Sequence, residues 1–244
     1  MNNPRNKNKK KSSQNNTIPK QLILRLANDC KQPLHCLNGY DPDHNELVVD
    51  LNNRMRLKIR YYQWLQLSSE QQQWMINLTE RNMRDLYEQS AWKWNRQSKM
   101  KEFKHPTAKH LIITSSNLDL ENNDGNELVS EALEKPIAFV HFRFEQGYRP
   151  DETSLYCYEL QVEPKYQNHN IGSYLMNQLE VLGSEFRLQK IHVTVLKKNI
   201  SAFNFYTKKL SFKIDDSSPS CCDQDADYEI LSLKLKSLKK SNPS

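Results

Sequence analysis

The sequence predicts a single α/β domain in which a mixed, mainly antiparallel β-sheet is flanked by helices. Three strand-like segments follow one another along the chain, His110–Ser115, Pro136–Phe144 and Leu155–Val162. After residue 155 the pattern becomes strand, helix, strand, helix, strand, which is typical of a sheet covered by helices. With 244 residues, the chain is long enough for one domain with a sizeable core.

The clearest helical pattern begins at Ile171. Its apolar residues are spaced by four, four, three and four positions, so they share one face of the helix: Ile171, Leu175, Leu179, Leu182 and Phe186. The elements expected after it are a strand at 191–196, a short helix at 201–210, and strands at 211–214 and 228–233.

The N-terminal half contains one well-defined helical pattern. Ser68-Ser69 followed by Gln72 resembles a capping box, and apolar residues at helical spacing extend the expected helix to about Gln89. A second, shorter helix is expected to contain Trp92 and Trp94.

Positive charge is concentrated at the two ends of the chain. The net charge is +6, yet ten positive charges lie near the termini, six in residues 1–20 and four in residues 234–240. The remaining residues therefore carry about −4, which suits a basic substrate better than nucleic acid. The expected organisation is a basic disordered tail (1–20), a domain (21–235) with an N-terminal extension (21–66) and an Asn-rich loop insertion (117–134), and a basic tail (236–244).

Composition also bears on compartment and metal content. No apolar run reaches the roughly 20 residues that span a bilayer, and the basic N-terminus lacks the apolar stretch of a secretory signal. Five scattered cysteines are typical of reduced thiols, and Cys30, His35 and Cys36 lack zinc-site spacing, so no metal is expected. The N-terminal tail is interpreted either as a solvated segment or as a nuclear-import signal, and we expect the protein in nucleus and cytoplasm.

The segment Gln167-Asn-His-Asn-Ile-Gly172 joins an expected strand to the helix that begins at Ile171. Small or flexible residues there let successive backbone N–H groups converge at the helix N-terminus. That end carries partial positive charge and unpaired donors, which suits a pyrophosphate. A glycine at a helix start is also common for simple close packing, so the surrounding sequence decides between the two interpretations.

This segment resembles the acetyl-CoA signature Q/R-x-x-G-x-G/A of the GNAT acetyltransferases, with Asn170 at the first glycine position. Asn adopts left-handed backbone angles more readily than most residues, so the replacement is physically mild. The segment from Asn199 to Tyr206 resembles the family's N-x-x-A-x-x-x-Y element. Longer strings resemble the NatD type of N-terminal α-amino acetyltransferase: residues 83–92, 141–144, 155–159, 212–219 and 228–232.

The resemblance implies acetyl-CoA as cosubstrate. It places the backbone of Leu160, Gln161 and Val162 at an opening between two splayed strands, where main-chain groups pair with the pantetheine arm. Asn199 is implied near the same cofactor. The residues implied at the pyrophosphate are Gln167, Asn168, His169, Asn170, Ile171, Gly172 and Ser173.

Acetyl transfer requires a neutral amine. The pKa of an α-amino group lies near 7.7–8, against about 10.4 for lysine, so removing its proton at neutral pH costs only about 1 kcal/mol. A carboxylate acting directly or through water suffices. Glu159 is the predicted base and Glu145 the alternative, and the resemblance implies Tyr206 as proton donor to the departing thiolate.

The resemblance surrounds the substrate peptide with aromatic and hydroxyl side chains. These are Tyr87, Trp92, Tyr158, Thr194 and Tyr228. Tyr156 shares a strand face with Tyr158, and Glu145 is placed on the same side. Such walls suit a narrow slot for small residues such as Ser-Gly. An acidic group is interpreted either as a contact for a substrate arginine or as a solvated loop: Asp215, Asp216, Asp223, Asp225, Asp227 and Glu229.

The function implied by the resemblance is acetylation of the free N-terminal Ser amine of core histones of the H-four and H-two-A types. The amine would attack directly in a ternary complex, and the protein would act as a monomer without an auxiliary subunit or stable nucleic-acid binding. Two alternatives stay open: a lysine or small-amine acetyltransferase on the same fold, and a non-catalytic chromatin or nucleic-acid adaptor with a degenerate version of it.

Overall fold

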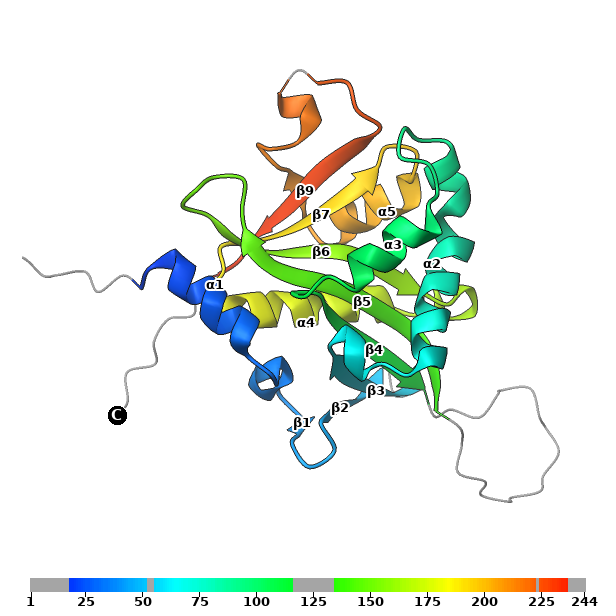
Figure 1. Ribbon diagram of the computed structural model, residues 1–244, viewed down its shortest axis with the longest axis vertical. Coiled ribbons are helices and arrows are strands. Elements are labelled where there is room, and N and C mark those ends of the chain that lie inside the picture. The colour runs from blue at the N-terminus through cyan, green and yellow to red at the C-terminus, as the bar shows by residue number, and fades with distance from the viewer. Residues whose placement is uncertain (1–17, 52–54, 116–133, 223, 237–244) are drawn as a thin grey trace, which may run out of the picture.

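A computed structural model describes residues 18–51, 55–115, 134–222 and 224–236 (Figure 1). Most of the basic tails expected at 1–20 and 236–244, and the loop insertion expected at 117–134 except its last residue, lie outside these residues.

The described residues form one sheet of nine strands in the order β1-β2-β3-β4-β5-β6-β7-β9-β8. Neighbouring strands are antiparallel except β6 and β7, which are parallel, so the sheet is mixed and mainly antiparallel as predicted. The strands are β1 (Tyr40–Asp41), β2 (Glu46–Leu51), β3 (Met55–Tyr62), β4 (Lys109–Ser115), β5 (Lys135–Gln146), β6 (Thr153–Val162), β7 (Lys190–Leu196), β8 (Lys213–Ile214) and β9 (Tyr228–Lys234).

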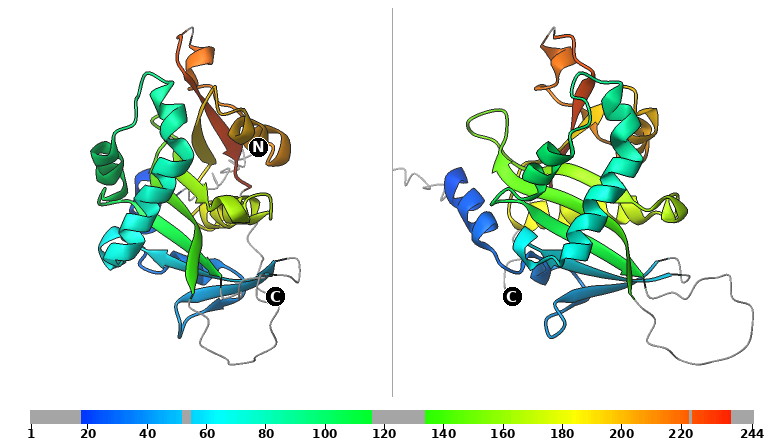
Figure 2. Two further views of the ribbon diagram at one scale, coloured as in Figure 1. Left: turned by 90° about the vertical axis from the view of Figure 1, so that its right-hand side faces the viewer. Right: turned by 45° about the vertical axis from the view of Figure 1, so that its right-hand side comes forward.

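Helices cover both faces of this sheet (Figure 2). The helices are α1 (Lys20–Asp29), α2 (Ser69–Glu88), α3 (Arg96–Phe103), α4 (Ile171–Glu185) and α5 (Ile200–Asn204), and α5 continues into a π-helical turn, Phe205–Lys209. Helices α2 and α3 lie on one face, and α4 and α5 lie on the other (Figure 2). Within the described part of the chain, no helix has both the length and the apolar character needed to cross a bilayer.

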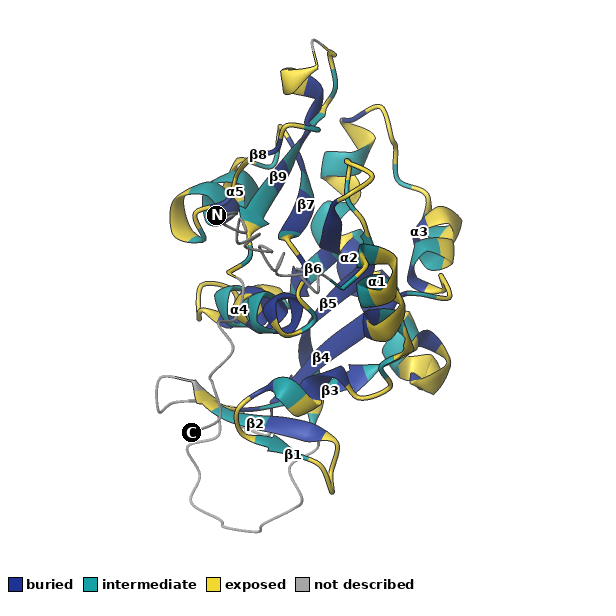
Figure 3. Cartoon of the chain, turned by 90° about the vertical axis from the view of Figure 1, so that its left-hand side faces the viewer, coloured by how far each residue is buried: buried dark blue, intermediate teal, exposed yellow. Residues whose placement is uncertain are grey.

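Strand alternation divides the core into two layers. Leu111 and Ile113 of β4 pack in the larger cluster with α4, whereas Ile112 between them packs with Phe103 and the α2 side chains. The α4 face buries Leu175 and other members of the predicted stripe, while Phe186 caps the helix and is half-buried. The central strands are consequently the most deeply buried part of the chain (Figure 3).

The N-terminal segment is continuous with the rest of the sheet. Strand β3 pairs with β4 from Leu57 opposite Ser115 to Tyr62 opposite His110. The apolar runs Leu47-Val48-Val49 and Leu57-Lys58-Ile59 lie in β2 and β3. Strands β1, β2 and β3, which lie within residues 21–66, thus extend the sheet beyond β4.

Two local expectations were wrong. Trp92 and Trp94 lie in the connection before α3 and not in a helix, because Asn95 caps α3 by accepting a hydrogen bond from the Ser98 amide at 2.8 Å. The capping box at the start of α2 uses Ser68, as expected, but its partner is Gln71 and not Gln72, since the Ser68 side chain accepts from the Gln71 amide.

Packing under α4 offers a direct test of the core. Leu175 is fully buried, so we expect Leu175→Ala to lower the free energy of unfolding by about 2–5 kcal/mol. Leu65 is 94% exposed, and Leu65→Ala is the matched control, with a change within about 0.5 kcal/mol. Denaturant unfolding of both variants measures the difference, and equal effects would contradict the assignment of the core.

Candidate active site

A cavity of about 560 Å³ opens on the sheet face that carries α2 and α3. Its walls come from the end of α2, the connection to α3, α3 itself, and strands β6, β7 and β9. The lining residues are Tyr87, Trp92, Lys93, Trp94, Asn95, Ser98, Lys99, Glu102, Tyr156, Tyr158, Thr194, Tyr228 and Ile230. Six of the seven predicted substrate residues are among them, and Glu145 is not.

Aromatic rings form most of the wall. The ring centroids of Trp92 and Tyr228 are 4.7 Å apart, and those of Tyr156 and Tyr158 are 4.8 Å apart. Tyr156 and Thr194 share a hydrogen bond between their hydroxyl groups, which joins β6 to β7 across the cavity. Trp92 is 46% exposed, so it lies at the rim.

A β-bulge in β6 brings two site residues onto one face. His141 pairs with Glu159 and Phe142 pairs with Cys157, so Tyr158 has no partner on β5. Because the extra residue shifts the alternation, Tyr158 and Glu159 both lie on the α3 side of the sheet. Tyr158 stacks on His141 with centroids 5.2 Å apart, and Glu159 pairs with Lys99 of α3.

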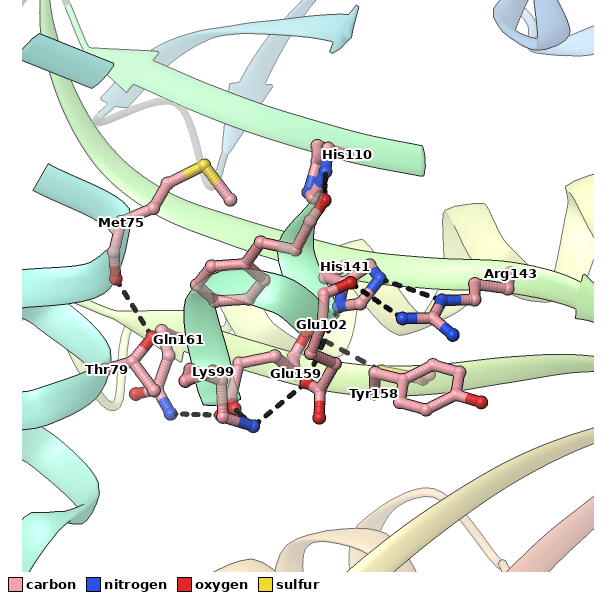
Figure 4. Close-up of polar contacts among 12 residues, drawn as sticks. Met75, Thr79, Lys99, Glu102, His110, His141, Arg143, Tyr158, Glu159 and Gln161 are labelled. Carbon is pink, nitrogen blue, oxygen red and sulfur yellow. Dashed lines mark hydrogen bonds and ion pairs between the residues drawn. The ribbon is translucent and has the colours of Figure 1, made fainter. Parts of the chain in front are cut away.

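The floor of the cavity is an ion cluster around Lys99 (Figure 4). The Lys99 Nζ lies 2.9 Å from Oε1 of Glu102 and 3.0 Å from Oε2 of Glu159. The other oxygen of Glu159 accepts a hydrogen bond from Gln161 Nε2 at 2.6 Å, and Gln161 in turn accepts one from Asn82 of α2 at 2.8 Å. Lys99 and Glu102 line the cavity, and Glu159 lies behind them.

Burial and charge act in opposite directions in this cluster. Burial disfavours the charge on Lys99, but the carboxylates of Glu159 and Glu102 outweigh it and raise the pKa of Lys99 above its ordinary value. Burial raises the pKa of Glu102, with Lys99 opposing the rise and Glu159 adding to it. Burial also raises the pKa of Tyr87 to about 12, so its hydroxyl stays protonated at neutral pH.

Two buried histidines support the cluster from β4 and β5. The rings of His110 and His141 stack with centroids 5.0 Å apart, and burial lowers the pKa of both, to about 4 for His110. Arg143 donates from Nε to His141 Nε2 at 3.4 Å. His141 Nδ1 lies 3.8 Å from Glu102 Oε1, so a neutral imidazole faces the floor carboxylate.

Glu145 occupies a different position from that expected of a base. It accepts hydrogen bonds from the Tyr158 hydroxyl, 3.0 Å from each carboxylate oxygen. The Arg143 guanidinium lies over the Tyr158 ring, 4.2 Å from its centroid. Glu145 therefore orients a wall residue from outside the cavity.

The opening predicted beside β6 is present. Parallel pairing of β6 with β7 runs from Ser154 opposite Lys190 to Cys157 opposite Val193. Beyond it, β6 continues to Val162 paired with β5 only, so Leu160, Gln161 and Val162 line the diverging edge. The Val162 carbonyl accepts hydrogen bonds from the side-chain amides of Asn82 and Gln167, both at 3.2 Å.

The segment before α4 has the backbone shape of an anion-binding loop. Asn168 and Asn170 both take left-handed angles, with φ of 63° and 66°. Asn170 is the N-cap residue of α4, and no side chain caps the helix. The first helical amides, those of Ile171, Gly172 and Ser173, therefore have no intrahelical partner.

Three more predicted residues have clear positions. A Cβ on Gly172 would lie 3.4 Å from Phe205 and 3.8 Å from Leu160, so this glycine packs closely against the diverging edge. Asn199 caps α5, accepting from the Ala202 amide at 3.1 Å. Tyr206 is buried in the α4-side core between Phe205 and Phe212 and does not line the cavity.

The acidic group near the C-terminus is largely engaged within the protein. Asp215 pairs with Lys190 at 2.8 Å, Asp216 with Arg149 at 3.0 Å, and Asp227 accepts from the Ala91 amide. Glu229 accepts from Ser218 and Ser220. Asp225 is exposed, and Asp223 lies outside the described residues. Four of the six carboxylates, Asp215, Asp216, Asp227 and Glu229, are therefore bound by groups of the protein itself.

Sequence reasoning missed the floor of the site. Lys99 and Glu102 belong to a helix whose residues are mostly charged or polar, Arg96–Phe103, which reads as a solvated helix. Their spacing of three residues was the available signal, because it puts both on one helix face. Among the described residues, no group of three or more His, Cys, Asp or Glu side chains is arranged to hold a metal ion.

Comparisons with known proteins identify the family of the chain. The model of a family described as the acetyltransferase (GNAT) family matches residues 81–212. The GNAT domain of PAT from S. lividans is similar, with 13% identity, a TM-score of 0.52, and coverage of 80% of this chain and 99% of that one.

Two further structures give lower scores. One is a GNAT-family acetyltransferase from Staphylococcus aureus, with 14% identity, a TM-score of 0.49, and coverage of 73% of this chain and 99% of that one. The other is Arabidopsis thaliana NAA60 in complex with a bisubstrate analogue, with 14% identity, a TM-score of 0.47, and coverage of 74% and 99%.

Two substitutions test whether the left-handed backbone angle of Asn170, before α4, affects stability. Asn170→Gly should leave the free energy of unfolding nearly unchanged, whereas Asn170→Ala should lower it by about 1 kcal/mol relative to Gly, because Cβ strain is felt at φ of 66°. Both variants lose the bond from Lys209 Nζ, so the comparison isolates the backbone. Equal free energies of unfolding for Asn170→Gly and Asn170→Ala, measured with denaturant, would contradict backbone strain from the Cβ atom at this position.

The buried histidines make stability depend on pH. Because the folded pKa of His110 lies near 4, below the ordinary value of about 6.5, the unfolded chain binds more protons between these values. Its contribution is present above pH 6.5 and is lost as the pH falls toward 4. We expect His110→Asn to show a shallower loss of unfolding free energy from pH 7 to 5 than the wild type, by about 1–2 kcal/mol. If the unfolding free energies of wild type and His110→Asn fall in parallel from pH 7 to 5, His110 does not contribute to the pH dependence.

Proposed function

Because the chain belongs to the GNAT family of acetyltransferases, whose members use acetyl-CoA, we propose that it acetylates the free α-amine of a protein N-terminus. The observation that carries the proposal is the meeting of two features at the β6 bulge. On one side lies the diverging edge of β6, with the uncapped amides of α4 beyond it. On the other side lies the aromatic cavity.

The residues of the α4 side fit the charged end of coenzyme A. A diphosphate accepts hydrogen bonds from converging backbone amides, and the partial positive charge of a helix N-terminus favours it. The left-handed angles of Asn168 and Asn170 turn the loop so that amides from Asn168 to Ser173 lead into α4. Close packing of Gly172 on Leu160 brings this end of the helix against the diverging edge.

The reaction proposed is direct attack in a ternary complex. The amine nitrogen bonds to the acetyl carbonyl carbon, the carbon–sulfur bond breaks, and its electron pair leaves with sulfur. Before the attack, the ammonium form of the amine gives one proton to a carboxylate. As the amide forms, the nitrogen loses a second proton, and sulfur gains one on release. The acceptor belongs to the carboxylates at the floor, where Glu159 is the residue predicted from sequence. Tyr206 remains the predicted donor to sulfur, and its hydroxyl is protonated at neutral pH because burial raises the pKa well above its ordinary value.

The shape and charge of the cavity favour an N-terminal amine of a small residue. Rings and hydroxyl groups form the walls, and Trp92 lies at the rim. The floor carries two carboxylates against one ammonium, which favours a cation. An α-amine loses its proton far more readily at neutral pH than lysine does. We propose histone N-termini that begin with Ser as the substrates, with action in nucleus and cytoplasm by a monomer.

A peptide assay tests this proposal. Purified protein and acetyl-CoA are incubated with a Ser-Gly-Arg-Gly peptide that has a free N-terminus, and with the same peptide blocked at its α-amine and carrying an internal lysine. We expect acetyl transfer, followed by mass spectrometry, to the free peptide only. Transfer to the blocked peptide would instead support the lysine acetyltransferase alternative.

The non-catalytic alternative has a separate signature. An adaptor that binds nucleic acid through its basic ends would show steep salt dependence of DNA binding and no acetyl transfer. Turnover of the free peptide, with weak DNA affinity at physiological salt, would exclude it.

A further inference from the structure

Resting on the proposed function, one further assignment follows from the cavity floor: we propose that Glu102 is the carboxylate that contacts the substrate amine and takes its proton, and that Lys99 is a positioning residue whose ammonium holds Glu102 beside Glu159. Neither residue was identified from the sequence.

Accessibility separates the two carboxylates. Glu102 lines the cavity, and its side chain is 29% exposed. Glu159 is not part of the lining, and its side chain is 6% exposed. One Glu159 oxygen holds the Gln161 amide, and the other is fully buried against the Lys99 ammonium. An amine in the cavity can therefore reach Glu102 directly, and it can reach Glu159 only if Lys99 moves.

The hydrogen-bond partners of Glu102 leave one of its carboxylate oxygens able to accept a further hydrogen bond. Its Oε1 takes the bond from Lys99 and faces His141 Nδ1 at 3.8 Å, and no described residue donates to its Oε2. The backbone carbonyl of Glu102 accepts from Arg143 Nη2 at 2.6 Å, which fixes the end of α3 over β5. Glu102 is thus held in place with one oxygen available for a substrate N–H.

Lys99 makes this arrangement possible. Both carboxylates lie within 3.0 Å of the same nitrogen, and Lys99 and Glu159 are buried. Without the ammonium, two like charges so close together would hold a proton between them, and the acceptor would be blocked. With Lys99 charged, the trio carries one net negative charge, which suits a cationic N-terminus entering the cavity.

Other groups around the trio do not replace Lys99. Tyr87 of α2 is protonated at neutral pH, and the buried imidazole of His141 on β5 is neutral. Arg143 is directed to the Glu102 carbonyl and the Tyr158 ring, and Glu145 beyond it is bound by the Tyr158 hydroxyl. Lys99 is therefore the cation whose nitrogen contacts both carboxylates.

The decisive comparison is between two isosteric substitutions. Glu102→Gln should lower kcat for the free N-terminal peptide by about 10²-fold or more, because a positioned proton acceptor is removed. Glu159→Gln should lower kcat less than Glu102→Gln does. Coenzyme A affinity by isothermal titration should be unchanged in both, which shows that the fold is intact. The assignment of Glu102 is overturned if Glu102→Gln retains kcat within twofold of the wild type, or if Glu159→Gln has the larger effect.

The positioning role of Lys99 is tested through the pH dependence of kcat. Lys99→Met should move the acid limb of the profile upward by about one pH unit or more, because the paired carboxylates then retain a proton. Lys99→Arg keeps the charge and should restore the wild-type limb. Lys101→Met removes an exposed lysine of the same helix and is the matched control.

Each outcome has a defined meaning. If Lys99→Met folds and the acid limb of its kcat profile lies at the same pH as in the wild type, the proposed positioning role of Lys99 is overturned. If Lys99→Met does not fold, Lys99→Arg decides, since an upward shift of its acid limb would contradict a role that depends on charge. If the wild type acetylates no free N-terminal peptide, the proposed function itself fails before the variants are compared.

Discussion

Hydrogen bonding between β6 and β7 ends at Cys157 and Val193, and the bulge at Tyr158 follows directly on β6. The two strands diverge from this point, since β6 continues on β5 while β7 continues on β9. A parallel pair that stayed joined would leave no open edge beside Leu160. The departure from regular pairing is therefore what gives the sheet a site, as bulges commonly do.

The charged floor depends on the same bulge. By adding one residue, it turns Glu159 toward α3, where Lys99 and Glu102 lie, and it keeps Tyr158 on the same face against His141. Burying two carboxylates is costly unless a cation and hydrogen bonds satisfy them. Lys99, Gln161 and Asn82 supply these partners from three different elements. The same ion cluster thus also connects α2 and α3 to the sheet.

Much of the fold could be predicted because local patterns agree with tertiary packing. The Leu175 and Leu179 stripe of α4 is buried as its spacing requires, and the αL angle of Asn170 matches the tolerance of Asn for that region. The aromatic lining was found only through resemblance, since Tyr156 or Tyr228 alone would pass for ordinary sheet residues. Trp92 and Trp94 were misassigned because the Asn95 cap outweighs the aromatic spacing. Lys99 and Glu102 were missed, because their three-residue spacing places them on one helix face but does not show that this face of a mostly polar helix is turned toward the sheet.

The central claim is that coenzyme A binds along the diverging edge of β6 with its diphosphate on the amides that begin α4. Hydrogen–deuterium exchange with and without coenzyme A measures this directly. The account predicts slower exchange on ligand addition at residues 158–162 and 167–173, with no change at Thr153–Cys157, which pair with both neighbouring strands or precede the opening. Protection confined to other parts of the chain, or no protection at saturating coenzyme A, would contradict it.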